Sequence, residues 1–391
     1  MEVEASRQSM DPESIRVATR RAQAALPRRR DHPGAEPGRF VLIHSGFSLN
    51  SEKVRVTLAA AGFAYTSHQA ELRLYENYAP EFVSLRMMAW DKQTPLCGEG
   101  KDPEAGFDPC LIPVLVDLEA DGGEGLIVVE SASICEYIAD LRGGGLRGRT
   151  EAERTKVAKH VTLVTETPHQ ELLFFGHPDP RRDRRPTFVR KMLKGGAGPF
   201  DAQLQELSRK LQEVQQPTVM RAYLAKIRKQ EEKRDAATAP GGGKRRMQEA
   251  AFAKLAALLR QLETDLAASS GDWLCGAQLT LADLFWGVSL FRLVWLGNAF
   301  LFDGLPETRA YADRLFETRA LLDASILYPG YMPSPYTAVF YDRHVGRAAG
   351  LAQRGKAALL GLAMSEIPPL LAAAAVAVAA AAAAWRWRRL R

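Results

Sequence analysis

Cysteine is scarce in this chain, and its few copies lack the spacing of a metal or disulfide motif. There are four, with no pair in CxxC spacing: Cys97, Cys110, Cys135 and Cys275. This pattern excludes a zinc ribbon and a disulfide-stapled fold, and it is typical of a reducing compartment. The first 38 residues lack a long apolar run, so we expect no secretory signal and predict a disordered extension over residues 1–38.

An excess of one charge is also lacking. The net charge is +6 over 391 residues, and basic residues alternate with acidic ones except in short runs such as PRRR, PRRDRRP and GGGKRRM. These runs lie among prolines and glycines, and we interpret them as solvated connectors. Nucleic acid is therefore not expected as a partner. With 46% hydrophobic and 25% charged residues, the chain has the composition of a folded protein with room for two domains.

The hydrophobic pattern predicts a small α/β domain over residues 39–145. Strand, helix and strand patterns are followed by two strands and a helix, at residues 39–44, 51–62, 63–71, 111–118, 126–130 and 131–141. This order is typical of a thioredoxin-like fold. Residues 86–107 are polar and interrupted by glycine and proline, so we expect a surface insertion without regular structure there.

The following part of the chain has apolar residues at helical spacing. It predicts an all-α domain over residues 150–330 with a loop at 236–246, and then a linker with a helix over 331–366. In LTLADLFW, Thr280 stands three residues before Asp283, which is a capping-box variant at a helix start.

The C-terminal segment differs from the rest. Residues 367–385 contain no charge in 19 positions and precede the basic end RWRRLR. As a helix this segment would extend about 28 Å, close to the ~30 Å hydrocarbon core of a bilayer. We therefore expect a single hydrophobic tail-anchor helix over 367–385. An alanine-rich helix lying on a surface is the alternative.

Three stretches of the first domain carry residues suited to one small ligand. Ser48 precedes a helix whose N-terminus can stabilise a thiolate. In LIPVL, a cis bond before Pro113 would turn the backbone N–H and C=O of Ile112 towards a peptide-like ligand. Glu130 can bind an ammonium group, and Ser131 begins a helix whose N-terminus can bind a carboxylate. Together they describe a site for glutathione, a tripeptide with a central thiol, and they require no metal.

LIPVL, ESASICEYI and WLCGAQLTLADLFW resemble the most recognisable stretches of the glutathione transferases, over roughly residues 39–316. Within that family, HSGFSLNSEKVRV, LYENYAPEFVSL, RAYLAKIRKQEEK and the hydrophobic tail resemble the membrane-tethered ganglioside-induced differentiation-associated proteins. TPHQELLFFGHP resembles the tetrachlorohydroquinone dehalogenases. The resemblance implies a glutathione transferase fold: a thioredoxin-like α/β domain, then an all-α domain. It also implies glutathione as co-substrate and a homodimer.

The resemblance places Ser48 where serine-type members hydrogen-bond the glutathione sulfur, with Ser45 and Ser51 as alternatives. Asn50 stands where the dehalogenases have cysteine, which argues against a thiol-disulfide step. The implied function is a membrane-tethered transferase that conjugates the glutathione thiolate to hydrophobic electrophiles. A non-catalytic glutathione-binding adaptor and a glutathione-dependent isomerase or dehalogenase are the alternatives.

Two assignments stay open. The residue that holds the glycine carboxylate of glutathione is one of four candidates, namely Arg86, Lys92, Gln93 and Lys101. His169 and His177 could line an electrophile site, but lone histidines beside aromatic residues are more often packing or surface groups. The tail implies a cytosol-facing organelle membrane. The mitochondrial outer membrane is the expected destination, with the peroxisome or the plastid envelope as alternatives.

Overall fold

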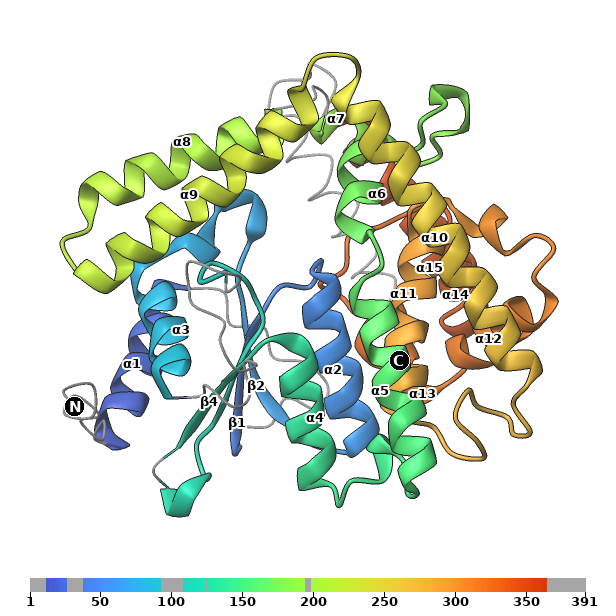
Figure 1. Cartoon of the computed structure of the whole chain (residues 1–391), viewed down its shortest axis with the longest axis horizontal. Helices are drawn as coiled ribbons and strands as arrows, with labels where there is room; N and C mark the ends of the chain where they lie inside the picture. The colour runs from blue at the N-terminus through green and yellow to red at the C-terminus, as the bar shows by residue number, and fades with distance from the viewer. Residues whose placement is uncertain (1–11, 27–37, 93–107, 124, 194–197, 364–391) are drawn as a thin grey trace. The chain divides into compact units, whose positions relative to one another are not determined.

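The computed structural model describes five stretches of the chain, residues 12–26, 38–92, 108–123, 125–193 and 198–363 (Figure 1). The chain forms two compact units. The first contains Met1–Arg142 together with Phe200–Glu232, and the second contains Gly143–Pro199 and Lys233–Arg391. The α/β domain is thus joined in one unit by helical residues that follow it by almost sixty positions.

The first unit is built on a four-stranded sheet with the order β2-β1-β3-β4. Strands β1 (Phe40–His44) and β2 (Tyr65–Gln69) are parallel, whereas β3 (Val114–Asp117) and β4 (Leu126–Val129) are antiparallel to their neighbours. All five residues of β1 are buried, as expected for a central strand covered on both faces. The thioredoxin-like fold predicted from the strand and helix order is confirmed.

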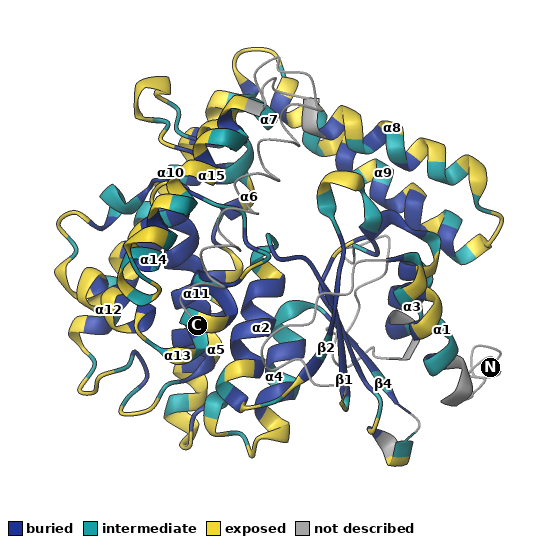
Figure 2. Cartoon of the chain, turned by 180° about the vertical axis from the view of Figure 1, so that it is seen from behind, coloured by how far each residue is buried: buried dark blue, intermediate teal, exposed yellow. Residues whose placement is uncertain are grey.

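Two pairs of helices cover the faces of this sheet. Helices α1 (Pro12–Ala25) and α3 (Pro80–Lys92) pack against each other, and so do α2 (Leu49–Ala61) and α4 (Ser131–Leu141). Figures 1 and 2 show the sheet between the two pairs. Helix α2 is capped at its C-terminus by Gly62, whose φ of 74° is a conformation that suits glycine.

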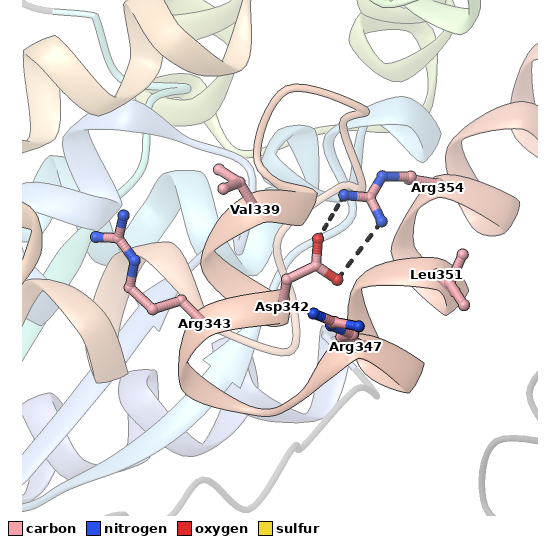
Figure 3. Close-up of a pocket in the computed structure, with 6 residues that line it drawn as sticks. All are labelled: Val339, Asp342, Arg343, Arg347, Leu351 and Arg354. Atoms are coloured by element: carbon pink, nitrogen blue, oxygen red, sulfur yellow. Dashed lines mark hydrogen bonds and ion pairs between the residues drawn. The ribbon is translucent and has the colours of Figure 1, made fainter.

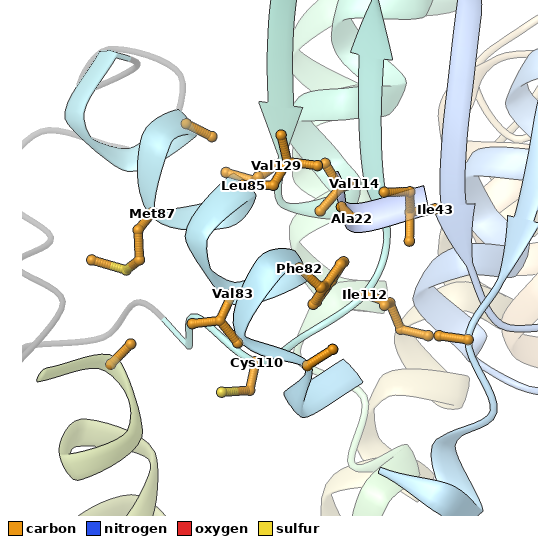
Figure 4. Close-up of a cluster of buried hydrophobic side chains, with 14 of the residues drawn as sticks. Ala22, Ile43, Phe82, Val83, Leu85, Met87, Cys110, Ile112, Val114 and Val129 are labelled. Carbon is orange, nitrogen blue, oxygen red and sulfur yellow. The ribbon is translucent and has the colours of Figure 1, made fainter. Parts of the chain in front are cut away.

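The predicted disordered extension is wrong for residues 12–26. Helix α1 buries Ile15, Ala22 and Leu26 in the hydrophobic core that also contains α3 and the sheet (Figure 4). The guanidinium of Arg16 donates to the carbonyl oxygen of Leu118 at 2.9 Å. Its apolar residues lie on one face and arginines on the other, which is the pattern of an amphipathic helix, so the sequence does contain the signal for α1.

The predicted insertion also begins later than expected. Helix α3 continues to Lys92, and Arg86, Met87 and Ala89 are buried in it. The polar residues around them made the segment look irregular, although the apolar ones recur at helical spacing with Phe82 and Val83, which are also in the core (Figure 4). Residues 93–107 lie outside the described part of the chain.

Helices α8 (Gly198–Glu213) and α9 (Pro217–Thr238) follow the predicted domain boundary at residue 150 in the chain but pack with the domain before it. Their helical character was predicted, but Leu207, Val219 and Tyr223 pack into the core of the first unit. The hydroxyl of Tyr223 donates to the carbonyl oxygen of Tyr78 at 2.6 Å. Residues 200–232, which the sequence assigned to an all-α domain over 150–330, thus pack in the same compact unit as the sheet.

The second unit is all-α. Its helices are α5 (Glu151–Thr165), α6 (His169–Phe175), α7 (Thr187–Met192), α10 (Gly243–Ala267), α11 (Leu281–Trp295), α12 (Pro306–Phe316), α13 (Arg319–Leu321), α14 (Ala338–His344) and α15 (Arg347–Ala363). Every residue of α11 except Val294 is buried, and Figure 2 shows this helix almost wholly in dark blue. The loop between α9 and α10 is shorter than predicted, at residues 239–242.

The predicted tail helix over 367–385 lies outside the described residues. The helices that the structure does describe include none that is both long enough and apolar enough to cross a membrane.

Candidate functional site

The turn from β1 to α2 brings three serines together at the N-terminus of α2. Ser48 is the N-cap, and its Oγ accepts a hydrogen bond from the backbone N–H of Ser51 at 3.3 Å. The Oγ of Ser51 in turn accepts from the N–H of Ser45 at 3.3 Å. Ser45 and Ser51 are 5% and 0% exposed, whereas Ser48 is half-buried. Ser48 is thus the one serine of the three with both surface access and a hydroxyl proton left to donate.

A buried positive charge lies beneath this turn. Arg55, on α2, has no exposed surface, and its guanidinium donates to the carbonyl oxygens of Ser45 at 3.1 Å and Gly46 at 3.4 Å. The same group lies 3.3 Å from Nδ1 of His44. A guanidinium stays charged at any physiological pH, so it adds to the positive potential of the helix N-terminus. The turn therefore favours an anion beside Ser48.

Sequence reasoning did not single out Arg55. The sequence sign of its burial is in SEKVRVTLAAAG, where Arg55 stands between two valines. The helix is buried over most of its length. A buried arginine needs acceptors, and here they are carbonyl groups of the turn that precedes its own helix.

The second stretch is the loop before β3. The Ile112-Pro113 peptide bond is cis, as the sequence led us to expect. The Ile112 side chain is 5% exposed and packs in the core (Figure 4). Among the described residues, no hydrogen bond involves the backbone N–H or C=O of Ile112. Those two groups suit main-chain pairing with an extended peptide-like ligand.

The third stretch is the junction of β4 and α4. Glu130 has φ 65° and ψ 119°, a conformation that residues with a side chain rarely adopt. Backbone strain of this kind concentrates at functional sites. Ser131 follows as the first residue of α4, so the open N–H groups of that helix come directly after Glu130 in the chain.

Arg86 connects the second and third stretches. Its guanidinium, on α3, donates to Oε1 of Glu130 at 2.8 Å and to the carbonyl oxygen of Pro113 at 3.3 Å. The Arg86 side chain is 1% exposed and that of Glu130 is 41% exposed. A buried arginine therefore holds the Pro113 loop and the Glu130 carboxylate in place, while part of the Glu130 side chain stays exposed.

This role was not foreseen for Arg86, which the sequence offered only as a candidate partner of the glycine carboxylate. Its two bonds to Glu130 and Pro113 commit it to positioning these residues. The side chains of Lys92, Gln93 and Lys101 lie outside the described part of the structure. The partner of the glycine carboxylate thus stays unassigned.

The described cysteines are not suited to nucleophilic chemistry. Cys110, Cys135 and Cys275 are free thiols and buried. Burial raises the pKa of Cys135 and of Cys275 to about 12, and it raises the pKa of Cys110 still further. These thiols are therefore protonated at neutral pH. Asn50 is exposed in the first turn of α2.

The two histidines singled out in the sequence have packing contacts in the second unit. His169 is 8% exposed, and its Nε2 lies 2.8 Å from Oγ of Ser289. The ring of His177 packs edge-on against Phe252, with 4.6 Å between ring centroids. Across the residues that the structure describes, no three His, Cys, Asp or Glu side chains are grouped as a metal site would need.

Two family models match the chain. Residues 47–141 match "Glutathione S-transferase, N-terminal domain", and residues 214–318 match "Glutathione S-transferase, C-terminal domain". The chain is 38% identical over 307 residues to the 2,5-dichlorohydroquinone reductive dechlorinases of two strains of Sphingobium indicum, covering 76% of this chain and 85% of theirs. The predicted likeness to the dehalogenase branch is thereby confirmed.

Solved structures are similar to a lesser degree. A glutathione transferase from Populus trichocarpa is 15% identical with a TM-score of 0.44, covering 73% of this chain and 97% of that one. A beta-etherase from Sphingobium sp. strain SYK-6 is 18% identical with a TM-score of 0.45, covering 73% and 98%. On the strength of both family models and the identity to the dechlorinases, the chain belongs to the glutathione S-transferase family.

Proposed function

We propose that this chain is a glutathione transferase that conjugates the glutathione thiolate to hydrophobic electrophiles, with Ser48 as the catalytic residue. The observation that carries the proposal is the hydrogen bonding and exposure of the Ser48 hydroxyl. Its Oγ accepts from the N–H of Ser51, so its own proton is available to a sulfur anion, and it is the accessible serine of the turn.

The energies agree with this role. A free thiol has a pKa near 8.5, and lowering it by about 2 units requires about 2.7 kcal/mol. A hydrogen bond from Ser48 to a charged sulfur contributes about 1.5–3 kcal/mol. The N-terminus of α2 adds about 0.3–1 kcal/mol. Together they amount to about 1.8–4 kcal/mol, a range that includes the required value of about 2.7 kcal/mol.

The other binding roles follow the chemistry of the ligand. The Ile112 backbone, before Pro113, pairs with the cysteinyl backbone of glutathione. Glu130 binds the ammonium group of the glutamyl end. The N–H groups at Ser131 bind the adjacent carboxylate, which the N-terminus of α4 also favours. Arg86 acts as a positioning residue, because it contacts Glu130 and Pro113.

The proposal is tested with the full chain on immobilised glutathione, followed by an assay with a chromogenic electrophile. Ser48→Ala should lower turnover and leave the affinity for glutathione within a few-fold. The pH at which the absorbance of the bound thiolate appears should rise by about 1–2 units, the equivalent of the lost hydrogen bond. Ser208→Ala, at an exposed position on α8, is the matched control.

An unchanged thiolate titration in Ser48→Ala would exclude Ser48 as the activating group. Retention of the wild-type chain on glutathione without turnover of any electrophile would favour the non-catalytic adaptor instead.

Reductive dehalogenation is a second candidate, supported by the 38% identity to the dechlorinases. Asn50, where the dehalogenases have cysteine, argues against it. The two reactions leave different products from 2,5-dichlorohydroquinone and glutathione. A stable glutathione conjugate supports the transferase. A dechlorinated hydroquinone together with oxidised glutathione supports the dehalogenase.

We also propose that residues 367–385 tether the chain, as a homodimer, to the cytosolic face of an organelle membrane, most simply the mitochondrial outer membrane. The uncharged length of the segment and its basic end support this. The full chain should resist carbonate extraction, and truncation after Glu366 should release it with its glutathione binding intact. Extraction of the full chain by carbonate would reduce the segment to a peripheral helix.

A further inference from the structure

The last two described helices have an unusual surface. Helices α14 and α15 pack against each other. Of the exposed large hydrophobic side chains in the described stretches, five fall within residues 336–362, namely Tyr336, Val339, Val345, Leu351 and Leu362. Leu351 is 65% exposed and Val345 is 56% exposed. Val339 and Leu351 also line the same pocket, and neighbouring exposed apolar side chains indicate an interaction site.

A pocket of about 410 Å³ lies on this surface (Figure 3). Its lining residues are Val339, Asp342, Arg343, Arg347, Leu351 and Arg354. Arg354 is paired with Asp342 at 2.5 Å, and Figure 3 shows two interactions joining them. Arg343 is paired with Glu317 at 2.6 Å. Arg347 forms no ion pair within the described residues, so the three arginines exceed the two carboxylates and leave a positive surface.

Gly350 determines how closely α14 and α15 approach at the pocket. A side chain at this position would overlap the carboxylate of Asp342. The Asp342 and Arg354 pair is therefore packed where the two helices meet, and the pocket lies between helices that are fixed to each other.

We infer that the patch formed by Val339, Arg343, Val345, Arg347 and Leu351, here named the basic-apolar patch, docks on a membrane surface that contains anionic lipids. Guanidinium groups bind lipid phosphates and carboxylates, and aliphatic side chains beside them enter the interface. Basic and apolar side chains both come from α14, the turn after it and α15.

The course of the chain supports a membrane as the occupant. Helix α15 ends at Ala363, and 28 residues follow it, including the uncharged segment 367–385. The patch therefore lies directly before the proposed tether along the chain. The patch itself consists of described residues and stands without the tether.

Charge argues against two other occupants. A second copy would oppose its own arginines to those of the first if the same patches met. The C-terminal RWRRLR of this chain is basic as well, so the pocket would repel it. An acidic peptide would pair with Arg347 but would leave Val345 and Leu351 in water, so the membrane is favoured.

The test uses the full chain and flotation with phosphatidylcholine vesicles, with and without phosphatidylserine. The measured quantity is the ratio of the two partition coefficients. A basic residue at an anionic surface contributes about fivefold, so Arg347→Glu should lower the ratio about tenfold or more. Arg347→Lys should restore most of it. Leu351→Ser should weaken binding to both kinds of vesicle.

Arg260→Glu is the matched control, because Arg260 is exposed on α10 and has no ion pair among the described residues. An unchanged ratio in Arg347→Glu, or an equal loss in Arg260→Glu, would overturn the inference. So would Arg347-dependent binding of a polyglutamate peptide without any preference for phosphatidylserine. Retention on glutathione, measured on the same samples, should be equal in all variants, which keeps this test separate from that of the proposed transferase.

Discussion

Glu130 is the residue whose geometry most directly constrains the site. It combines a φ of 65° with a carboxylate that Arg86 holds at 2.8 Å, and 41% of its side chain remains exposed. The guanidinium offsets part of the carboxylate charge. The free energy with which the Glu130 carboxylate attracts an ammonium group should therefore lie at the lower end of the range for charge-assisted hydrogen bonds.

Glu130→Gln should weaken glutathione binding about tenfold, since about 1.5 kcal/mol corresponds to slightly more than one decade in affinity. Titration calorimetry measures this directly. Glu136→Gln, on the same helix but away from its N-terminus, serves as the control. Wild-type affinity in a folded Glu130→Gln variant would show that glutathione is oriented differently from the proposal.

His160 is the residue whose burial has a consequence for stability. It is 2% exposed, the indole N–H of Trp286 donates to its Nδ1 at 3.2 Å, and its Nε2 lies 3.3 Å from Asp265. Burial lowers the pKa of His160 to about 4, against an opposing effect of the Asp265 carboxylate. The folded protein therefore prefers the neutral ring.

The unfolded chain binds a proton at His160 near pH 6.5, whereas the folded chain does so only near pH 4. The contribution of the neutral His160 ring to the free energy of unfolding is thus complete above about pH 6.5. It is lost as the pH falls towards 4, by about 3 kcal/mol in all. Urea unfolding at several pH values measures this loss. His160→Gln should flatten the profile in that window, and parallel profiles for both proteins would contradict the prediction.

At the scale of elements, the start of α11 shows how a buried carboxylate obtains its hydrogen-bond donors. Asp283 has no exposed surface and accepts from the N–H of Leu274 at 2.9 Å, from the N–H of Thr280 at 2.7 Å and from the hydroxyl of Tyr311 at 2.7 Å. The capping box foreseen in LTLADLFW is confirmed. Its carboxylate also connects α11 to α12 through Tyr311.

Asp283→Ala should lower the free energy of unfolding by about 3–5 kcal/mol, because several buried donors lose their acceptor together. Asp283→Asn, which keeps the shape and one acceptor, should lose less. Chemical denaturation monitored by tryptophan fluorescence gives both values. Asp272→Ala, at an exposed position, should change stability by no more than about 0.5 kcal/mol, and a similar small change in Asp283→Ala would refute the capping role.

At the scale of the whole molecule, the units do not follow the order of the chain. Helices α8 and α9 place Leu207, Val219 and Tyr223 in the core of the α/β unit, and Lys226 pairs with Asp108 at 2.5 Å. A fully buried large side chain stabilises by about 1.5–3 kcal/mol. The α/β domain is thus incomplete without residues 200–232.

A fragment of residues 12–142 should consequently be several kcal/mol less stable to urea than the same fragment joined to residues 200–232 by a flexible linker. A linked fragment with Tyr223→Ala, which loses the bond to Tyr78 and leaves a cavity, should fall between the two. Equal stability of the two fragments would show that α8 and α9 contribute little to this unit.

Features that depend on neighbouring residues could be predicted from the amino-acid sequence. The order of strands and helices, the cis bond before Pro113, the cap at Ser48 and the box at Thr280 are encoded within a few residues. Side-chain periodicity and capping act over one or two turns, and a single sequence displays them. The placing of Glu130 and Ser131 at a strand-to-helix junction was predictable for the same reason.

Features that depend on residues far apart in the chain became visible in the folded structure. Arg86 and its partner Glu130 are 44 positions apart, and Lys226 and its partner Asp108 are 118 apart. Nothing local identifies the partner of a buried charge. The burial of Ser45 and Ser51, the packing of α1 against α3 and the membership of α8 and α9 in the first unit likewise follow from which surfaces meet. Those contacts form between segments far apart in the chain, so no local pattern encodes them.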